Sequence, residues 1–170
     1  MSLVVRPMTL EETAFVIDYF HGATPEHLEL MGVDPTRIPD KLSWRERFAR
    51  DLALPAEQRA SFATIWLDGG APFGFSTLSH IRFGEQANMH LHIVDADRRK
   101  SGFGVHCVRQ SMAIYFQALK LKRLLCEPNA FNTAPNRTVQ KAGFRYVKTY
   151  WTVPGPLNFH QAVTRWVYEP

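Results

Sequence analysis

The segment HIVDADRRKSGFG, residues 92–104, constrains the fold of this chain more than any other stretch. Its apolar start is typical of the end of a β-strand, a short polar loop follows, and Gly102 opens a helical pattern. Backbone N–H groups converge where such a loop enters a helix, and the helix dipole is positive at the same point. The segment therefore predicts a site for an anion of the diphosphate type. Three basic residues add mobile positive charge around it: Arg98, Arg99 and Lys100.

Two glycines in this segment favour close approach of the anion to the backbone. Gly102 and Gly104 would leave no side chain between the main-chain amides and a diphosphate. The segment is not a Walker loop, because no Gly-Lys-Ser/Thr follows at the required distance. It is not a complete dinucleotide-binding fingerprint either, since Cys107 stands where that motif has its last glycine. A phosphate-binding loop of another kind is expected.

Hydrophobic periodicity and turn residues predict an α/β protein around this loop. The run Asp68-Gly69-Gly70 is a strong hairpin signal, whereas residues 21–60 are irregular apart from a short amphipathic helix in SWRERFARDL. The order of elements predicts a mixed, mostly antiparallel central sheet flanked by helices, not a series of βαβ repeats. The expected strands cover residues 4–6, 61–67, 72–80, 88–94, 123–127, 144–153 and 161–168, and the clearest helices follow the capping-box pair Thr9 and Glu12 and cover residues 102–119 and 133–142.

Length and composition indicate an ordinary globular protein. The 170 residues are expected to form one domain over residues 1–170, as a monomer or homodimer. No apolar run approaches the roughly 20 residues needed to span a bilayer, and no export leader is visible, so a cytoplasmic protein without a membrane partner is expected. Cys107 and Cys126 are expected to be reduced, buried thiols. The net charge of +4 is compatible with a phosphorylated cofactor and with a nucleic-acid backbone, so charge alone does not choose between them.

Two motifs make the interpretation more specific. Arg99, Gly102 and Gly104 stand at the three defining positions of Arg/Gln-x-x-Gly-x-Gly/Ala, and this run resembles the coenzyme A signature of the GNAT N-acetyltransferase superfamily. Residues 132–144 resemble the later family element, in which an asparagine precedes a helix that ends in Lys-x-Gly-Phe. The resemblance covers residues 62–150 well. It implies the GNAT acyl-CoA N-acyltransferase fold, acetyl-CoA as co-substrate without a metal, and transfer of the acetyl group to an amine of a small molecule or a protein N-terminus.

The resemblance also implies where the cofactor binds. The strands over residues 88–94 and 123–127 should splay apart, with pantetheine between them and the backbone N–H of His92 against the thioester carbonyl. An amide there would stabilise negative charge on the carbonyl oxygen. Asn132 would bind near pantetheine or the diphosphate, although a helix-capping role is an equally good interpretation. The implied cofactor-binding residues are Ile93, Val94, Arg99, Lys100, Ser101, Gly102, Phe103, Gly104 and Asn132.

The attacking amine must lose a proton, and a histidine suits this task because its pKa lies near neutral pH. His90 and His92 share one strand face with Asn88, which stands where many family members carry a base and cannot act as one. His-Leu-His is similar to the paired histidines of arylalkylamine N-acetyltransferases, and His90 keeps the better spacing to the loop. His90 is therefore the expected base, with a structural histidine as the alternative interpretation and His80 as a second candidate.

Other interpretations remain open at this stage. Val139 stands where many members have a tyrosine acid, so the general acid is unassigned. Together with Asn88, this departure favours an alternative in which the fold binds acyl-CoA without turnover, as a sensor or structural protein. The acceptor is a small-molecule or peptide amine, not a nucleic acid, and its pocket would lie between residues 21–60 and the stiff turn in residues 154–160. Nothing in the sequence identifies that amine.

Overall fold

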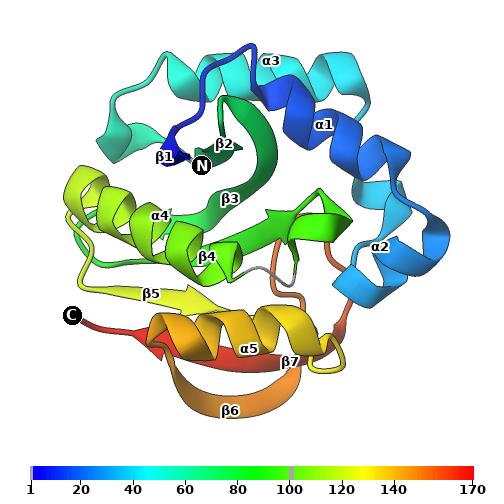
Figure 1. Ribbon diagram of the computed structural model, residues 1–170, viewed down its shortest axis with the longest axis vertical. Coiled ribbons are helices and arrows are strands. Elements are labelled where there is room, and N and C mark those ends of the chain that lie inside the picture. The colour runs from blue at the N-terminus through cyan, green and yellow to red at the C-terminus, as the bar shows by residue number, and fades with distance from the viewer. Residues whose placement is uncertain (1, 100–101) are drawn as a thin grey trace.

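Seven strands form one sheet in this protein, whose computed structural model describes residues 2–99 and 102–170 (Figure 1). The strand order is β1-β2-β3-β4-β5-β7-β6. Strands β4 and β5 are parallel, and the other five neighbouring pairs are antiparallel. The predicted α/β fold with a mixed, mostly antiparallel sheet is therefore confirmed.

The element bounds follow the sequence pattern closely. Helix α5 and strand β7 coincide with the predicted ranges, and the Asp68-Gly69-Gly70 turn joins β2 to β3. The strands are β1 Leu3–Pro7, β2 Phe62–Asp68, β3 Ala71–Arg82, β4 Gln86–Ile93, β5 Arg123–Cys126, β6 Arg145–Thr152 and β7 Gln161–Tyr168, and the helices are α1 Thr13–Gly22, α2 Pro25–Met31, α3 Lys41–Leu52, α4 Phe103–Leu119 and α5 Thr133–Ala142. Short 3₁₀ turns cover Pro35–Arg37, Ala56–Gln58 and Ala96–Arg98.

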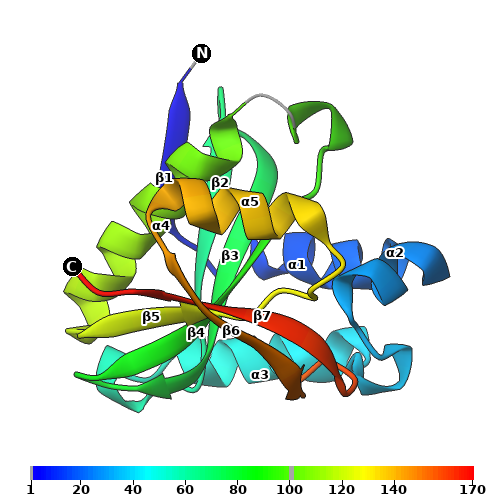
Figure 2. The ribbon, with the colours of Figure 1, turned by 90° about the horizontal axis from the view of Figure 1, so that it is seen from below.

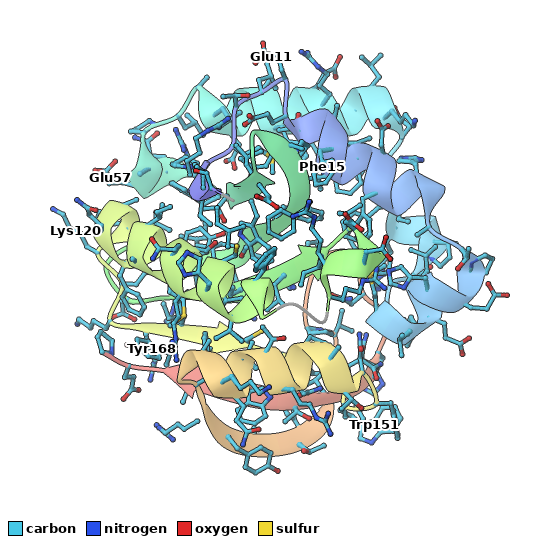
Figure 3. The ribbon with its side chains drawn as sticks, in the orientation of Figure 1. Glu11, Phe15, Glu57, Lys120, Trp151 and Tyr168 are labelled. Carbon is cyan, nitrogen blue, oxygen red and sulfur yellow. The ribbon has the colours of Figure 1, made fainter. Side chains whose placement is uncertain are left out.

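Helices cover both faces of the sheet and bury two separate apolar cores. Helices α4 and α5 lie on one face, and α1, α2 and α3 lie on the other (Figure 2). Trp66 and Tyr115 are fully buried in the first core. Phe75 is fully buried in the second, where Phe15 of α1 contacts its ring edge-on and points toward the centre of the molecule (Figure 3). Alternation of side chains along β3 and β4 distributes residues between these two cores.

A buried polar network ties α4 to the middle of the sheet. The Tyr115 hydroxyl donates to Oγ of Ser76 at 2.9 Å, and Ser76 donates to the carbonyl oxygen of His90 at 2.8 Å. Ser111 on α4 accepts from the indole N–H of Trp66 at 2.9 Å. Because these groups are buried, losing one partner would leave a polar atom unsatisfied at a cost of about 1–3 kcal/mol. The network therefore holds β4 firmly at His90.

The segment over residues 21–60 is more regular than its sequence indicates. Helix α2, which was not predicted, starts with Thr24 accepting from the N–H of His27 at 3.2 Å, and it ends at Gly32 with φ of 71°. A Cβ at Gly32 would lie 1.9 Å from the Gln161 side chain, whose Nε2 donates to the Gly32 carbonyl at 2.8 Å. This contact with β7 is invisible to local periodicity, and it places α2 and the following α3 beside the site. Helix α3 is the predicted amphipathic helix.

Among the described residues, no helix is long and apolar enough to cross a bilayer. The predicted pair Thr9 and Glu12 forms both capping-box hydrogen bonds in the turn directly before α1, which begins at Thr13: the N–H of Thr9 donates to Glu12 at 2.8 Å, and the N–H of Glu12 donates to Thr9 at 3.4 Å.

Candidate functional site

Strands β4 and β5 separate halfway along β4. Their pairing runs from Gln86 opposite Arg123 to Met89 opposite Cys126. Strand β4 then continues to Ile93, still paired with β3, whereas β5 ends at Cys126. The second half of β4 therefore has one free edge, and backbone groups along this edge are available to a ligand. This is the splay that the family resemblance implies.

A cavity of about 750 Å³ opens beside this free edge. It runs from Leu91 and Asn132 at the gap to Trp44 and Phe48 on α3. Its walls are largely apolar, and the rings of Phe20, Trp44 and Phe48 contact one another at centroid distances of 5.6 and 6.0 Å. The turn predicted as a pocket wall also lines it through Pro154 and Pro156. A cavity of this size suits a drug-sized molecule or the arm of a larger one.

The glycines at the start of α4 have two different structural reasons. Gly102 caps the helix with φ of 79°, and none of the described residues places an atom within 4 Å of a Cβ added there. Gly104 is buried in the first turn, where an added Cβ would lie 3.0 Å from Cδ1 of Ile93. The first turn of a helix leaves its N–H groups unpaired, and the open space at Gly102 gives an anion access to them. The geometry therefore fits a diphosphate.

The basic residues of the loop differ in their availability. Arg99 is exposed, and its Nε donates to the Ile93 carbonyl at 3.1 Å. Arg98, expected to add mobile charge here, instead forms ion pairs with Asp68 and Asp95 and lies over the ring of Phe73. This correction arises because Asp68 comes from the β2–β3 hairpin, far away in sequence.

Most of the other predicted cofactor residues surround the helix start. Ile93 and Val94 are half-buried at the end of β4, and Phe103 packs edge-on against Phe73 at 6.1 Å. Lys100 and Ser101 lie outside the described residues. Asn132 stands at the N-cap position of α5, as the capping interpretation predicts, and it also lines the cavity, but its side chain makes no capping hydrogen bond within the described part of the chain.

The hydrogen-bond register of β4 decides which amides face the gap. The N–H of Val94 donates to the Phe73 carbonyl on β3 at 2.8 Å. His92, two residues before Val94, pairs with Phe75 of the same strand β3. Because antiparallel strands alternate between bonded and non-bonded pairs, the N–H of His92 also points to β3. The N–H of Leu91 points the other way, into the gap. This arrangement differs from the expectation that the His92 amide faces the thioester, because the N–H groups of neighbouring residues in a strand point to opposite sides.

His90 lies in the cavity wall and contacts a second polar side chain. Its Nε2 is 2.7 Å from Oγ of Ser79 on β3. The ring also lies against the turn after β6, where a Cβ at Gly155 would be 2.8 Å from Cε1. Burial, with the charge of His80 as a second cause, lowers the pKa of His90 to about 4. The imidazole is therefore neutral at pH 7.

His92 has a different environment. Its ring lies among Tyr19, Phe20 and Phe75 at centroid distances of 5.3, 5.2 and 5.0 Å. Burial, with His90 as the next cause, lowers the pKa of His92 to about 3. The ring therefore stays neutral and acts as part of the aromatic wall between β4 and α1.

One buried carboxylate at the site had no signal in the sequence. Glu127 follows β5, its side chain is 4% exposed, and its Oε2 accepts from Nε of Arg165 at 3.1 Å. Tyr150 donates to the same oxygen, and Nδ2 of Asn88 lies 3.3 Å from the other one. Burial and the nearby carboxylate raise the pKa of Tyr150. These residues come from four different strands or strand ends, so spacing along the chain could not reveal the cluster.

The thiols behave as predicted. Cys107 and Cys126 are free and buried, and burial raises the pKa of each to about 12. Among the described residues, no group of three or more histidine, cysteine, aspartate or glutamate side chains is arranged to hold a metal ion.

Comparison with known proteins gives one family. The model of the acetyltransferase (GNAT) domain matches residues 2–145. No curated protein matches the sequence.

Solved structures with the same fold include three acetyltransferases. Aminoglycoside acetyltransferase AAC(6')-Ib in complex with coenzyme A has a TM-score of 0.71 and 17% identity, covering 99% of this chain and 95% of that chain. RimL, the ribosomal L7/L12 alpha-N-protein acetyltransferase, in complex with coenzyme A, has a TM-score of 0.77 and 11% identity, and the match covers 99% of this chain and 94% of that chain. Spermidine N-acetyltransferase from Vibrio cholerae, in complex with CoA and spermine, has a TM-score of 0.75 and 14% identity, and the match covers 98% of this chain and 95% of that chain. At identities this low, the structural match establishes the shared fold alone.

Proposed function

Because the chain belongs to the GNAT acetyltransferase family, which uses acetyl-CoA as co-substrate, we propose that residues 1–170 form one catalytic domain that acetylates a primary amine with an apolar body. The observation that carries this proposal is the continuity of the β4–β5 gap with the cavity beneath α3. A thioester in the gap and an amine in the cavity would meet beside His90. The family match describes an acetyltransferase and gives no support to the alternative of a non-catalytic sensor.

The cofactor side would act through the backbone. The N-terminal amides of α4 would bind the diphosphate, with Gly102 leaving them accessible, Gly104 letting the first turn pack closely on Ile93, and Arg99 adding charge. Pantetheine would lie in the gap beside β4. The remaining proposed contacts are Ile93, Val94, Lys100, Ser101, Phe103 and Asn132.

The N–H of Leu91 is the proposed donor to the thioester oxygen. It points into the gap, and the pairing of β4 with β5 has already ended at Met89. A fixed donor aimed at an oxygen that gains negative charge stabilises the transition state more than the ground state. The strand itself is held by the bond from Ser76 to the His90 carbonyl, so this donor is preorganised.

His90 is the proposed proton acceptor. The amine nitrogen forms the C–N bond with its lone pair and becomes acidic, the C–S bond breaks, and the thiolate leaves and is protonated by solvent. The proton of the amine passes to the neutral imidazole of His90. His92 contributes no proton transfer in this proposal, since its ring is enclosed by three aromatic side chains.

The cavity favours a monoamine over a polyamine or an aminoglycoside. Among the described residues that line it, the carboxylates are Asp51 and Glu127. Asp51 accepts from the N–H groups of Ala60 and Ser61 at 2.8 and 2.9 Å, and Glu127 is paired with Arg165. Neither carboxylate is left to bind a second cationic group, whereas aromatic rings offer apolar contact area. A cytoplasmic location and a monomeric or homodimeric state stay predictions from the sequence.

The experiment combines binding and turnover. Acetyl-CoA should raise the melting temperature of the wild type, as expected for any ligand of the native state, and Gly102→Trp should lose this shift. Gly84→Trp is the matched control, because Gly84 also has a positive φ of 75° and open space around it, in the β3–β4 turn. Thiol release should then be faster with 2-phenylethylamine than with spermidine or kanamycin. Binding without thiol release for any amine, including an N-terminal peptide, would contradict catalysis.

A further inference from the structure

A chain of hydrogen-bonded side chains leads from His90 to the surface. Nε2 of His90 lies 2.7 Å from Oγ of Ser79, and the same Oγ lies 3.1 Å from Nδ1 of His80. His90 and Ser79 are half-buried, whereas His80 is exposed. All three residues line the cavity. The two contacts thus join the reaction site to solvent through side chains alone.

The local backbone is bent in a way that brings these groups together. The pairing of β3 with β4 shifts register between Ser79 and Arg82, which marks an irregularity in the strand. His80 lies in this irregularity with φ of 50°, a conformation that non-glycine residues rarely adopt. A regular strand would send the side chains of residues 79 and 80 to opposite faces. The irregularity instead lets the His80 ring reach the hydroxyl of Ser79, and strain of this kind concentrates at functional sites.

The donor and acceptor groups can be ordered in one direction. In this order Nε2–H of His90 would donate to Oγ of Ser79, the Ser79 hydroxyl would donate to Nδ1 of His80, and Nε2–H of the exposed His80 would exchange with solvent. In this order Nδ1 of His90 is left as the acceptor for the amine proton. When Nδ1 gains that proton, Nε2 passes its own to Ser79, Ser79 passes its own to His80, and His80 releases one to water. Each group gains one proton and loses one, which leaves both imidazoles in the opposite tautomer, and proton exchange with solvent must restore the first tautomer before the next turnover.

We propose that Ser79 and His80 form a proton relay that carries the proton of the acceptor amine from His90 to solvent. This inference rests on the proposed function, because it needs His90 as the proton acceptor. A relay is useful here because a buried imidazolium is unfavourable, and His90 must return to its neutral form before the next turnover. Ser79 and His80 act through His90 and are positioning residues.

Several charged or titratable groups surround His90 and enter any pH profile. His80 comes from β3, His92 from β4, and Glu127 from the end of β5. Helix α3 contributes three further groups to the same cavity: Arg47, Arg50 and Asp51. Removal of one relay member must therefore be compared with its conservative replacement, which leaves these charges in place.

The first test replaces Ser79. Ser79→Ala should lower kcat about tenfold or more and leave the Kd of acetyl-CoA and the KM of the amine unchanged, while Ser79→Thr keeps the hydroxyl and should keep most of the activity.

His80→Ala should lower kcat severalfold in weak buffer, and added imidazole should restore it. His160→Gln is the control, because His160 is exposed and stacks on Trp151 outside the relay. An unchanged kcat in Ser79→Ala, or a loss in His80→Ala that imidazole does not restore, would overturn the relay.

A second readout does not depend on turnover. Long-range ¹H–¹⁵N spectra of the free protein at pH 8 should show His90 protonated on Nε2 and His80 unprotonated on Nδ1. The opposite tautomer of His90 would overturn the relay even if the enzyme is active. Absence of acetyl-CoA binding by the wild type would instead contradict the proposed function itself, so the two failures are distinguishable.

Discussion

The two sides of the β4–β5 gap are built from different parts of the chain. On the proposed cofactor side, the groups are backbone amides at Leu91 and at the start of α4, where Gly102 leaves open space and Gly104 packs against Ile93. On the acceptor side, the groups are side chains from β3, β4, α3 and the turn after β6. A backbone site leaves a compact mark in the sequence because few residue types permit its geometry. A side-chain site assembled from distant elements leaves none.

The largest expected effect tests whether the cofactor side really depends on the backbone. Replacing the Leu91 amide by an ester removes its N–H and keeps its side chain, and should lower kcat about 10²–10³-fold because a preorganised donor is lost. The Kd of acetyl-CoA should change little. Single-turnover kinetics of the semisynthetic enzyme measure this.

The same ester at residue 92 provides the matched control. It removes an N–H that the register directs to β3, so it should lower stability and leave kcat close to that of the wild type. A greater loss of kcat at position 92 than at position 91 would reverse the assignment of the two amides.

The next effect tests whether the acceptor side depends on side chains. His90→Gln should lower kcat about 10²-fold, because glutamine can keep a bond to Ser79 but cannot accept a proton. Acetyl-CoA should stabilise this variant as it does the wild type. Steady-state rates with thermal shift measure both quantities, and unchanged turnover would remove His90 as the base.

A smaller effect separates His92 from His90. The folded state lowers the pKa of His92 to about 3, below the value of about 6.5 in an unfolded chain, so the unfolded state binds more protons at acidic pH. The free energy of unfolding should therefore be constant above pH 6.5 and fall as the pH drops toward 4. His92 should account for up to about 2 kcal/mol of this decrease at pH 5. His92→Phe fits the aromatic wall and should reduce this slope in urea titrations at several pH values, while His90, whose pKa is lowered to about 4, maintains part of it.

The control for this slope is again His160→Gln, which should follow the wild-type curve. His92→Phe should also retain turnover, since its ring takes no proton in the proposed reaction. Loss of turnover at full acetyl-CoA affinity would show that His92 acts chemically and that the two histidines share the task.

The smallest effect concerns acceptor choice. Trp44 lines the cavity and packs on Phe20 and Phe48, so Trp44→Ala should raise the KM for an aromatic amine about tenfold without changing the Kd of acetyl-CoA. Trp151→Ala is the control, because Trp151 is 67% exposed on β6 and outside the cavity lining (Figure 3). Equal effects of both variants on KM would place the acceptor elsewhere.

The sequence by itself determined the sheet, the α4 helix and the glycine loop. Alternating β-formers, the Asp68-Gly69-Gly70 turn and the apolar stripe of α4 are local patterns that few other structures satisfy. Gly102 was identifiable because its positive φ disfavours most other residues. The free thiols followed from composition alone.

Tertiary structure alone decided how the site is completed. The sequence placed His90 and His92 on one strand face, but only the pairing register with β3 shows that the Leu91 amide faces the gap. The pairing of Arg98 with Asp68, the cluster at Glu127 and the contact of Ser79 with His90 each join residues more than ten positions apart. Such contacts depend on strand order and register, and these are set by packing of the whole sheet and not by the residues that end up touching.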